Sequence, residues 1–274
     1  MTNMSVKSLH IYPVKSGHGV DLQTVDVHQR GLRGDRRFML VDAEGMFITQ
    51  RQSPKLAQLH VQTTDMGLVL SWPDREPLIV GFPDPACRKS VKVWRSQVDT
   101  AIAAQGVNDV LSIWLEKPVA LVFMDGASER LANEAWTHTP APVSFADGYP
   151  VLVTNTASLE ALNTLISANG EASLPMRQFR PNIVIQSDEP WGEDGWTQLT
   201  IGDVVLDLVK PCARCVMTTL DQNTGEKQGR EPLRALKTLR SSTDPRNPGV
   251  IFGMNAVPRQ LGVIRVGDMV STGA

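Results

Sequence analysis

Apolar residues recur in short runs along the first third of the chain, and residues typical of turns separate these runs. Each run predicts a strand, and together they cover residues 6–14, 20–28, 38–42, 56–63, 67–72, 78–82 and 90–94. Residues 43–45 predict a hairpin turn, after which residues 46–49 return along the preceding strand. Strands repeated at intervals of about 8–12 residues favour a β-barrel or a β-sandwich.

The period of the apolar positions changes after residue 105. Residues 106–116 carry apolar side chains at helical spacing, which predicts an amphipathic helix. Asn108 or Asp109 would cap its start, and Pro118 prevents its continuation.

Two more helices are expected in the second half of the chain. Asn155 or Thr156 would cap a helix that ends at Asn169 and the following glycine. Pro232 suits the first residue of a short helix, because proline is tolerated where the backbone N–H has no helical partner. Further apolar runs predict strands at residues 119–124, 152–154, 182–186, 204–209, 251–254 and 261–266.

The whole pattern predicts a mainly β protein with a few helices, of the α+β class. The switch out of pure β structure places a boundary near residues 117–124. We therefore expect a β-barrel-like domain over residues 1–120 and a β-barrel domain with flanking helices over residues 121–274. Residues 125–142, which are polar and irregular, are expected to form a surface loop.

Composition narrows the class of protein further. Of the 274 residues, 42% are hydrophobic and 20% charged, so the chain can bury a core and lacks the signature of disorder. The net charge of −2 excludes a broad basic field for nucleic acid. No apolar run approaches the roughly 18–20 residues that span a bilayer, and no signal-peptide core opens the chain. We expect a cytoplasmic protein with no membrane span.

The stretch from Lys210 to Gly225 concentrates the candidate chemistry. It holds Cys212 and Cys215, two of only three cysteines, with Arg214 directly before the second. A neighbouring cation favours the thiolate form, and a thiolate is a nucleophile or a soft metal ligand. Residues 216–220 predict a short strand and residues 221–225 a turn.

The thiol pair allows several interpretations. A structural zinc needs four ligands, but only Cys87 remains and the five histidines show no paired spacing. A thioredoxin-like dithiol normally opens a helix, whereas the residues after Cys215 are strand-like. Two interpretations remain. Either one cysteine is a functional thiolate and the other takes no part, or the cysteines are buried and inert. A chain with three cysteines is not a disulfide scaffold and suits a reducing compartment.

Cations gather at several expected junctions of strand and loop. A single arginine or lysine at such a position is most often solvated at the surface. Several together offer guanidinium and ammonium groups that suit a phosphate or a carboxylate. An anionic cofactor with one thiolate ligand would explain both the cations and the thiol pair. The cations in question are Lys15, Arg33, Arg36, Arg37, Arg51 and Arg180.

Several motifs, in a fixed order over essentially the whole chain, resemble the MOSC family with its N-terminal β-barrel domain. The similarity includes the mitochondrial amidoxime-reducing component and bacterial proteins that reduce N-hydroxylated bases. The N-terminal motifs are residues 12–16, 34–38 and 49–52, and the MOSC motifs are residues 145–150, 157–159, 179–182, 212–215 and 252–255.

The resemblance implies a molybdenum cofactor, a pyranopterin with a terminal phosphate, whose metal is held by two dithiolene sulfurs and one cysteine. Cys215 is then the implied molybdenum ligand and catalytic residue. A hydrogen bond from Asn155 is implied where relatives often have serine. The implied cofactor-binding residues are Lys15, Arg36 or its neighbour Arg37, Arg180, Asn182, Arg214 and Asn155.

The implied activity is reduction of N-hydroxylated substrates such as hydroxylaminopurines and amidoximes, a detoxifying oxidoreductase reaction. Asp147 is a candidate proton donor or simply a turn former. The chain lacks the C-x₄-C-x₂-C spacing of an iron–sulfur domain, so we expect no such cluster in it. Its electrons are expected from a separate ferredoxin, cytochrome or flavoprotein.

Two alternatives stay open on the sequence alone. One is a carrier of cofactor or sulfur, because MOSC domains also end molybdenum-cofactor sulfurases. The other is a non-catalytic β-barrel interaction module with an inert cysteine pair. Pyridoxal phosphate binding is associated with the family as a whole, and the oligomeric state is left open.

Overall fold

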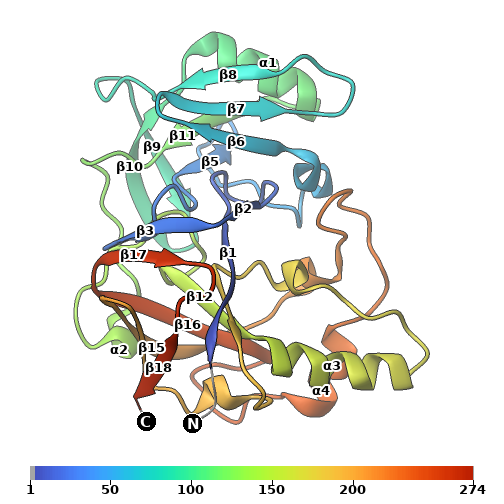
Figure 1. Cartoon of the computed structure of the whole chain (residues 1–274). Coiled ribbons are helices and arrows are strands. Elements are labelled where there is room, and N and C mark those ends of the chain that lie inside the picture. Colours follow the sequence, from blue (N-terminus) through green and yellow to red (C-terminus); the bar gives the residue numbers. More distant parts are fainter. Residues whose placement is uncertain (1–3, 274) are drawn as a thin grey trace.

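The computed structural model describes residues 4–273 and shows a mainly β molecule of the α+β class, as predicted (Figure 1). The strands formed by residues 60–102 lie at the top of the view, and most strands and helices of the second half lie in its lower part. The first strand, β1 (Ser5–Ile11), descends from the middle into that lower part. The outermost residues of the expected ranges 1–120 and 121–274 lie outside the described part. In the described part of the chain, no helix combines the length and the apolar character needed to cross a membrane.

The largest sheet has eight strands and forms the lower part of the molecule. Most neighbours are antiparallel, but β12 and β13 run parallel, and a helix connects them. In spatial order the strands are β18 (Val270–Gly273), β14 (Gln198–Ile201), β15 (Val204–Ala213), β16 (Ile251–Gln260), β12 (Val151–Asn155), β13 (Ile183–Gln186), β1 (Ser5–Ile11) and β2 (Val20–Leu22).

Three smaller sheets build the rest of the β structure. A four-stranded sheet has the order β5 (Phe38–Val41), β11 (Ala120–Phe123), β10 (Ser96–Ile102) and β9 (Arg88–Val93). A three-stranded sheet consists of β6 (His60–Thr64), β7 (Gly67–Ser71) and β8 (Leu78–Gly81). Another joins β17 (Gly262–Arg265) to β3 (Thr24–His28) and β4 (Gly31–Leu32).

The two halves of the sequence share strands. From the N-terminal half, β1 pairs with β13 of the large sheet, and β3 pairs with β17. In the other direction, β11 (Ala120–Phe123), whose last three residues follow the expected boundary at residue 120, pairs with β5 and β10. The division near residue 120 stays a prediction, but the structure shows that strands from both sides of it complete each other's sheets.

The two main helices form where the apolar spacing predicted them. In α1 (Gln105–Leu115), neither Asn108 nor Asp109 is the cap, because Asn108 instead bonds the Ala103 carbonyl and the Leu121 N–H. In α3 (Thr156–Ala168), Asn155 is the cap and accepts a hydrogen bond from the Ala157 N–H.

Short helical turns complete the structure. A one-turn helix interrupts the loop expected at residues 125–142. Pro232, expected as the first residue of a helix, is instead the N-cap, one residue before the helix begins. The short elements are α2 (Glu134–Thr137), α4 (Leu233–Leu239), η1 (Pro54–Gln58), η2 (Met176–Phe179), η3 (Gly192–Asp194) and η4 (Val216–Thr219).

The strand predicted at residues 216–220 is wrong, since these residues form the 3-10 turn η4. The Thr218 hydroxyl donates to the Cys215 carbonyl at 2.9 Å, and the Thr219 hydroxyl donates to the Val216 carbonyl at 2.8 Å. These bonds to carbonyls three residues earlier favour a helical turn over an extended strand. The strand predicted from residue 56 begins only at His60, because η1 occupies its first part.

Candidate functional site

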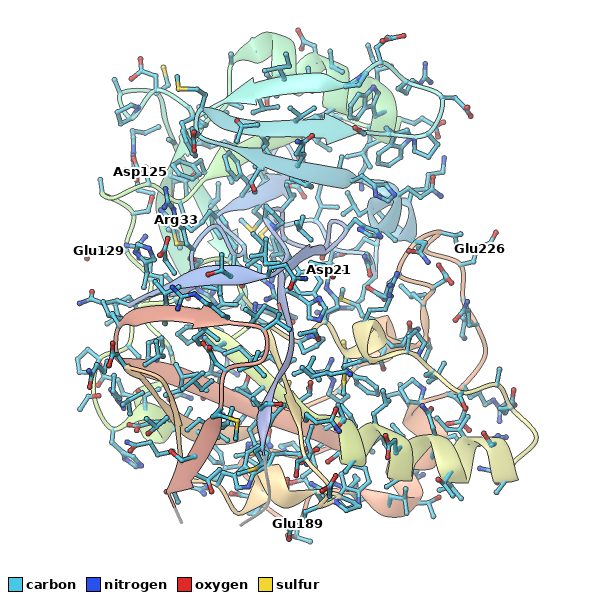
Figure 2. The ribbon with its side chains drawn as sticks, in the orientation of Figure 1. Asp21, Arg33, Asp125, Glu129, Glu189 and Glu226 are labelled. Atoms are coloured by element: carbon cyan, nitrogen blue, oxygen red, sulfur yellow. The ribbon has the colours of Figure 1, made fainter. Side chains whose placement is uncertain are left out.

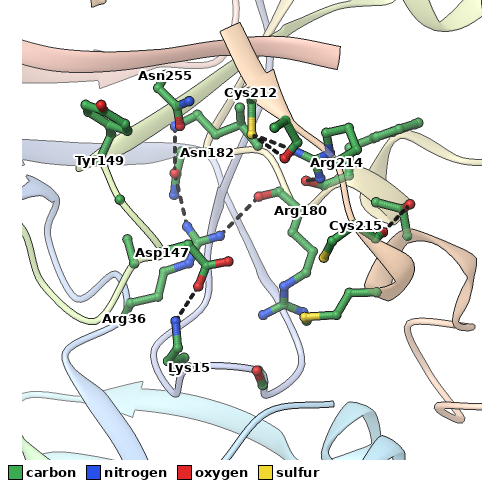
Figure 3. Close-up of a pocket in the computed structure, with 18 of the residues that line it drawn as sticks. Lys15, Arg36, Asp147, Tyr149, Arg180, Asn182, Cys212, Arg214, Cys215 and Asn255 are labelled. Atoms are coloured by element: carbon green, nitrogen blue, oxygen red, sulfur yellow. Dashed lines mark hydrogen bonds and ion pairs between the residues drawn. The ribbon is translucent and has the colours of Figure 1, made fainter. Parts of the chain in front are cut away.

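A cavity of about 330 Å³ lies beside the C-terminal end of β15, where loops from distant parts of the chain meet (Figure 3). Its wall combines residues of the N-terminal loops, the loop before β12, the segment around η2 and the stretch that carries both thiols. Six of the eight residues predicted for the site line it: Lys15, Arg36, Arg180, Asn182, Arg214 and Cys215.

Cys215 stands between β15 and η4 and is partly exposed to this cavity. Its carbonyl oxygen accepts the N–H and the hydroxyl of Thr218, which ties the start of η4 to the cysteine. The side chain is therefore carried by an ordered turn at the wall of the cavity.

Arg214 contacts a different thiol from the one expected. Its guanidinium donates to the Cys212 sulfur at 3.0 Å and to the Phe179 carbonyl at 2.6 Å. The Nε of Arg214 is buried and has no hydrogen-bond partner among the described residues. Adjacency in sequence suggested Cys215 as the partner, but along an extended backbone the side chains at 212 and 214 lie on one side.

Arg36 is held from three sides at the base of the cavity. It donates to the Asp35 carboxylate at 2.8 Å, to the Asn182 side-chain oxygen at 3.0 Å and to the Arg180 carbonyl at 3.1 Å. Asn182 also accepts the Leu152 N–H, so it joins the arginine to the start of β12. This network fixes the direction of the Arg36 fork, as expected of a preorganised binding group.

Arg180 is a buried cation with no carboxylate partner among the described residues. Its guanidinium donates to the Gln222 side-chain oxygen at 3.2 Å and lies 4.1 Å from the ring centroid of Tyr12. Arg36 lies 4.3 Å from the same ring. Burial lowers the pKa of Arg180 to about 10, which still leaves the side chain charged at neutral pH. A buried, uncompensated cation in a cavity wall favours an anionic ligand.

Lys15 and Asp147 form an ion pair at the wall of the cavity. The Lys15 ammonium donates to the Asp147 carboxylate at 2.5 Å and to the Phe145 carbonyl at 2.8 Å. Burial lowers the pKa of Lys15, although the carboxylate opposes this shift. Desolvation in the cleft raises the pKa of Asp147, but Lys15, with smaller contributions from Arg51 and Arg36, outweighs it and holds this pKa well below its usual range.

Asp147 is therefore a carboxylate at neutral pH and not a proton donor by itself. Its loop is positioned by Arg130, which the sequence analysis missed. The Arg130 guanidinium donates to the carbonyls of Ser144, Ala146 and Asp147 at 2.7, 2.6 and 2.9 Å. Nothing in the sequence indicated that Arg130 positions this loop, because its hydrogen-bond partners are backbone carbonyls and not side chains.

Two predicted residues are not brought to the cavity. Arg37 points away and donates to the Met124 carbonyl, whereas its neighbour Arg36 lines the cavity. Asn155 is fully buried, caps α3 and donates to the Glu189 carbonyl at 2.8 Å. Arg33, from the same loop as Arg36 and Arg37, is exposed at the surface and pairs with Asp26 (Figure 2).

The cavity wall carries an excess of positive charge. Its charged lining comprises the cations Lys15, Arg36, Arg180, Lys210 and Arg214, and one carboxylate, Asp147. Cys212, the other thiol of the predicted stretch, also lines it, and Lys210, Tyr149 and Asn255 line it although the sequence assigned them no role. The site combines a partly exposed thiol with guanidinium groups that still have unpaired N–H donors. This combination suits a ligand in which a soft metal is joined to an anionic group.

Comparison with known protein families identifies the class of protein to which this fold and site belong. A family model of the MOSC N-terminal beta barrel domain matches residues 3–118, and a model of the MOSC domain matches residues 140–271. Together these two matches cover most of the chain. The chain belongs to the family of MOSC proteins with an N-terminal β-barrel domain, which confirms the resemblance stated from its motifs.

Relatives in vertebrates match over nearly the whole chain. The mitochondrial amidoxime-reducing component 1 of Mus musculus is 33% identical over 282 residues, which cover 97% of this chain and 81% of the relative. Component 2 of Rattus norvegicus and component 1 of Homo sapiens are each 31% identical, over 97% of this chain and 82% of the relative.

Proposed function

We propose that this protein is a molybdenum-cofactor-dependent reductase of N-hydroxylated compounds such as amidoximes and hydroxylaminopurines. The observation that carries the proposal is the cavity in which Cys215 faces cations from three distant segments. The names of the relatives, amidoxime-reducing components, support the same class of reaction.

The residues fit the cofactor. Arg180 lacks a carboxylate partner among the described residues, and the buried Nε of Arg214 is unpaired, so both keep capacity for an anionic or polar ligand. Cys215 would hold the metal, because a thiolate suits a soft, redox-active ion. Lys15, Arg36, Arg180, Asn182 and Arg214 would hold the pterin and its phosphate. The bound cofactor would supply two-electron oxygen-atom transfer.

The protein's own groups would bind the substrate and manage protons. Reduction of an N–OH group breaks the N–O bond, consumes two electrons and two protons, and releases the N–H compound and water. The Lys15 Nζ holds a proton that it shares with the Asp147 carboxylate, at the wall of the cavity. We assign proton delivery to this pair rather than to Asp147 alone. Electrons would come from a separate ferredoxin, cytochrome or flavoprotein.

Expression in a host that makes the molybdenum cofactor tests the proposal. The purified protein should contain molybdenum and release a fluorescent oxidised pterin, and with a reductant it should convert benzamidoxime to benzamidine. Cys215→Ser should lose activity and metal, whereas Cys87→Ser, at an exposed thiol away from the cavity, should keep both. A Cys215→Ser protein with full metal content and full activity would refute the ligand assignment.

A carrier role is the second candidate, because Cys212 places another sulfur in the same cavity, in contact with Arg214. A carrier would bind the cofactor without turnover, or hold a persulfide at Cys212 or Cys215. Mass spectrometry of the intact protein under non-reducing conditions detects the persulfide, and the benzamidoxime assay detects turnover, so the two measurements together distinguish the functions.

A further inference from the structure

Trp94 occupies a costly backbone conformation close to the cavity. The hairpin between β9 and β10 has a two-residue loop, Trp94 and Arg95, between the paired residues Val93 and Ser96. Trp94 has φ +55°, in the left-handed region that favours glycine or asparagine at such loops. A bulky side chain there is unusual, and strain of this kind gathers at functional sites.

The Trp94 ring stands beside the mouth of the cavity rather than in a core. Its indole N–H lies 3.4 Å from the Asp147 carboxylate, which lines the cavity. The Asp147 side chain is 61% exposed, so it marks the open side of the site. Trp94 itself is 38% exposed, so part of its ring is open to a ligand at this side of the site.

Neighbouring side chains fix the ring in this position. The Arg51 guanidinium lies 4.7 Å from the Trp94 centroid, and the Phe47 ring lies 5.0 Å away at an angle of 52°. Arg51 is exposed and forms no ion pair among the described residues, and its guanidinium packs over the indole. Arg51, Phe47 and Trp94 together form an aromatic lip, with one cation, at the entrance.

We propose that this lip selects planar, conjugated N-hydroxylated compounds over saturated ones of the same size, with Trp94 stacking on the ring of the substrate. The inference rests on the proposed function and names a specificity-determining residue for it. An indole offers a large, preorganised apolar face, and ring-on-ring contacts are worth more than the area that they bury. A saturated ring is puckered and lacks that contribution.

The test compares two amidoximes that differ in planarity. Benzamidoxime and cyclohexanecarboxamidoxime are titrated calorimetrically into the cofactor-loaded protein without reductant, so that no turnover occurs. We expect the native protein to bind benzamidoxime about three- to tenfold more tightly, the range typical of an aromatic pair. Trp94→Gly, which suits the positive φ and should therefore fold, should bring the ratio close to one.

Two further variants make the result specific. Trp94→Phe should keep most of the preference, because it retains a ring. Trp72→Leu removes a tryptophan that packs on Trp114, away from the cavity, and should leave the ratio unchanged. A native protein without preference, or a Trp94→Gly protein that keeps it, overturns the proposal. Reductant-driven turnover of benzamidoxime is measured separately, so failure of the proposed function is distinguishable from failure of the lip.

Discussion

At the scale of single residues, the decisive feature is which of two neighbouring side chains enters the site. The motif at residues 34–38 offers Arg36 and Arg37 with equal chemistry, and only the fold separates them. Arg36 has φ +46° and turns inward onto Asp35, whereas Arg37 starts the path into β5 and reaches the Met124 carbonyl.

This difference predicts unequal effects on stability. Arg36→Met leaves the Asp35 carboxylate, which is only 2% exposed, without its cation, and breaking such a buried pair costs about 3–5 kcal/mol. Arg37→Met loses bonds to one carbonyl and a contact with the Phe123 ring, and should cost less, about 2 kcal/mol. Urea unfolding of both variants measures the difference. Equal losses would contradict the assigned roles.

The Lys15–Asp147 pair predicts a pH dependence. Because the pKa of Asp147 is lower in the folded protein than in the unfolded chain, the pair stabilises the fold above the ordinary carboxyl pKa of about 3.9. This stabilisation is lost as the pH falls below that value. Asp147→Asn should therefore lower the free energy of unfolding by a constant amount between pH 5 and 7, and the deficit should shrink toward pH 2. A deficit that grows in acid would have the wrong sign.

At the scale of elements, apolar periodicity predicted most strands and both long helices, because their burial follows the backbone period. It failed where side chains bond locally, as in η4, whose threonine hydroxyls hold a helical turn in a sequence of strand-like residues. It also missed β10, β14 and β18, whose polar residues alternate with few apolar ones. The sequence predicted the residues that its thiol and arginine motifs contain and that line the cavity. It did not predict Arg130, because this arginine positions the loop through backbone carbonyls, which leave no motif.

The turn after η4 packs closely against another element, which gives a further prediction. Gly225 has φ +80°, and a Cβ at this position would lie well inside contact distance of the Pro54 carbonyl at the start of η1. Gly225→Ala should thus destabilise the fold by about 2 kcal/mol or more, from backbone strain and displacement of η1. Gly202→Ala, also at positive φ but in open space, is the matched control for strain alone. Equal melting temperatures for the two variants would argue against the packing contribution.

At the scale of the whole molecule, the site exists only because the two halves of the chain are joined by shared strands. Lys15 and Arg36 come from the first half, and Arg180 and Cys215 come from the second. The strand β1 connects the two groups, since it pairs with β13, which follows Arg180 in the chain, and leads into the loop that carries Lys15. A stable placement of the cations around the thiol therefore depends on the pairing of both halves.

Shared strands predict that the halves do not unfold separately. A fragment of residues 1–120 would lose β13, the partner of β1, and all but the first residue of β11, the partner of β5. It should lack a cooperative transition, whereas the full chain should unfold in one calorimetric step with equal van't Hoff and calorimetric enthalpies. Extending the fragment to residue 126 restores β11 but not β13, so it should recover order only in the sheet around β5. Two resolved transitions in the full chain, or a cooperative 1–120 fragment, would show that each half folds without strands from the other.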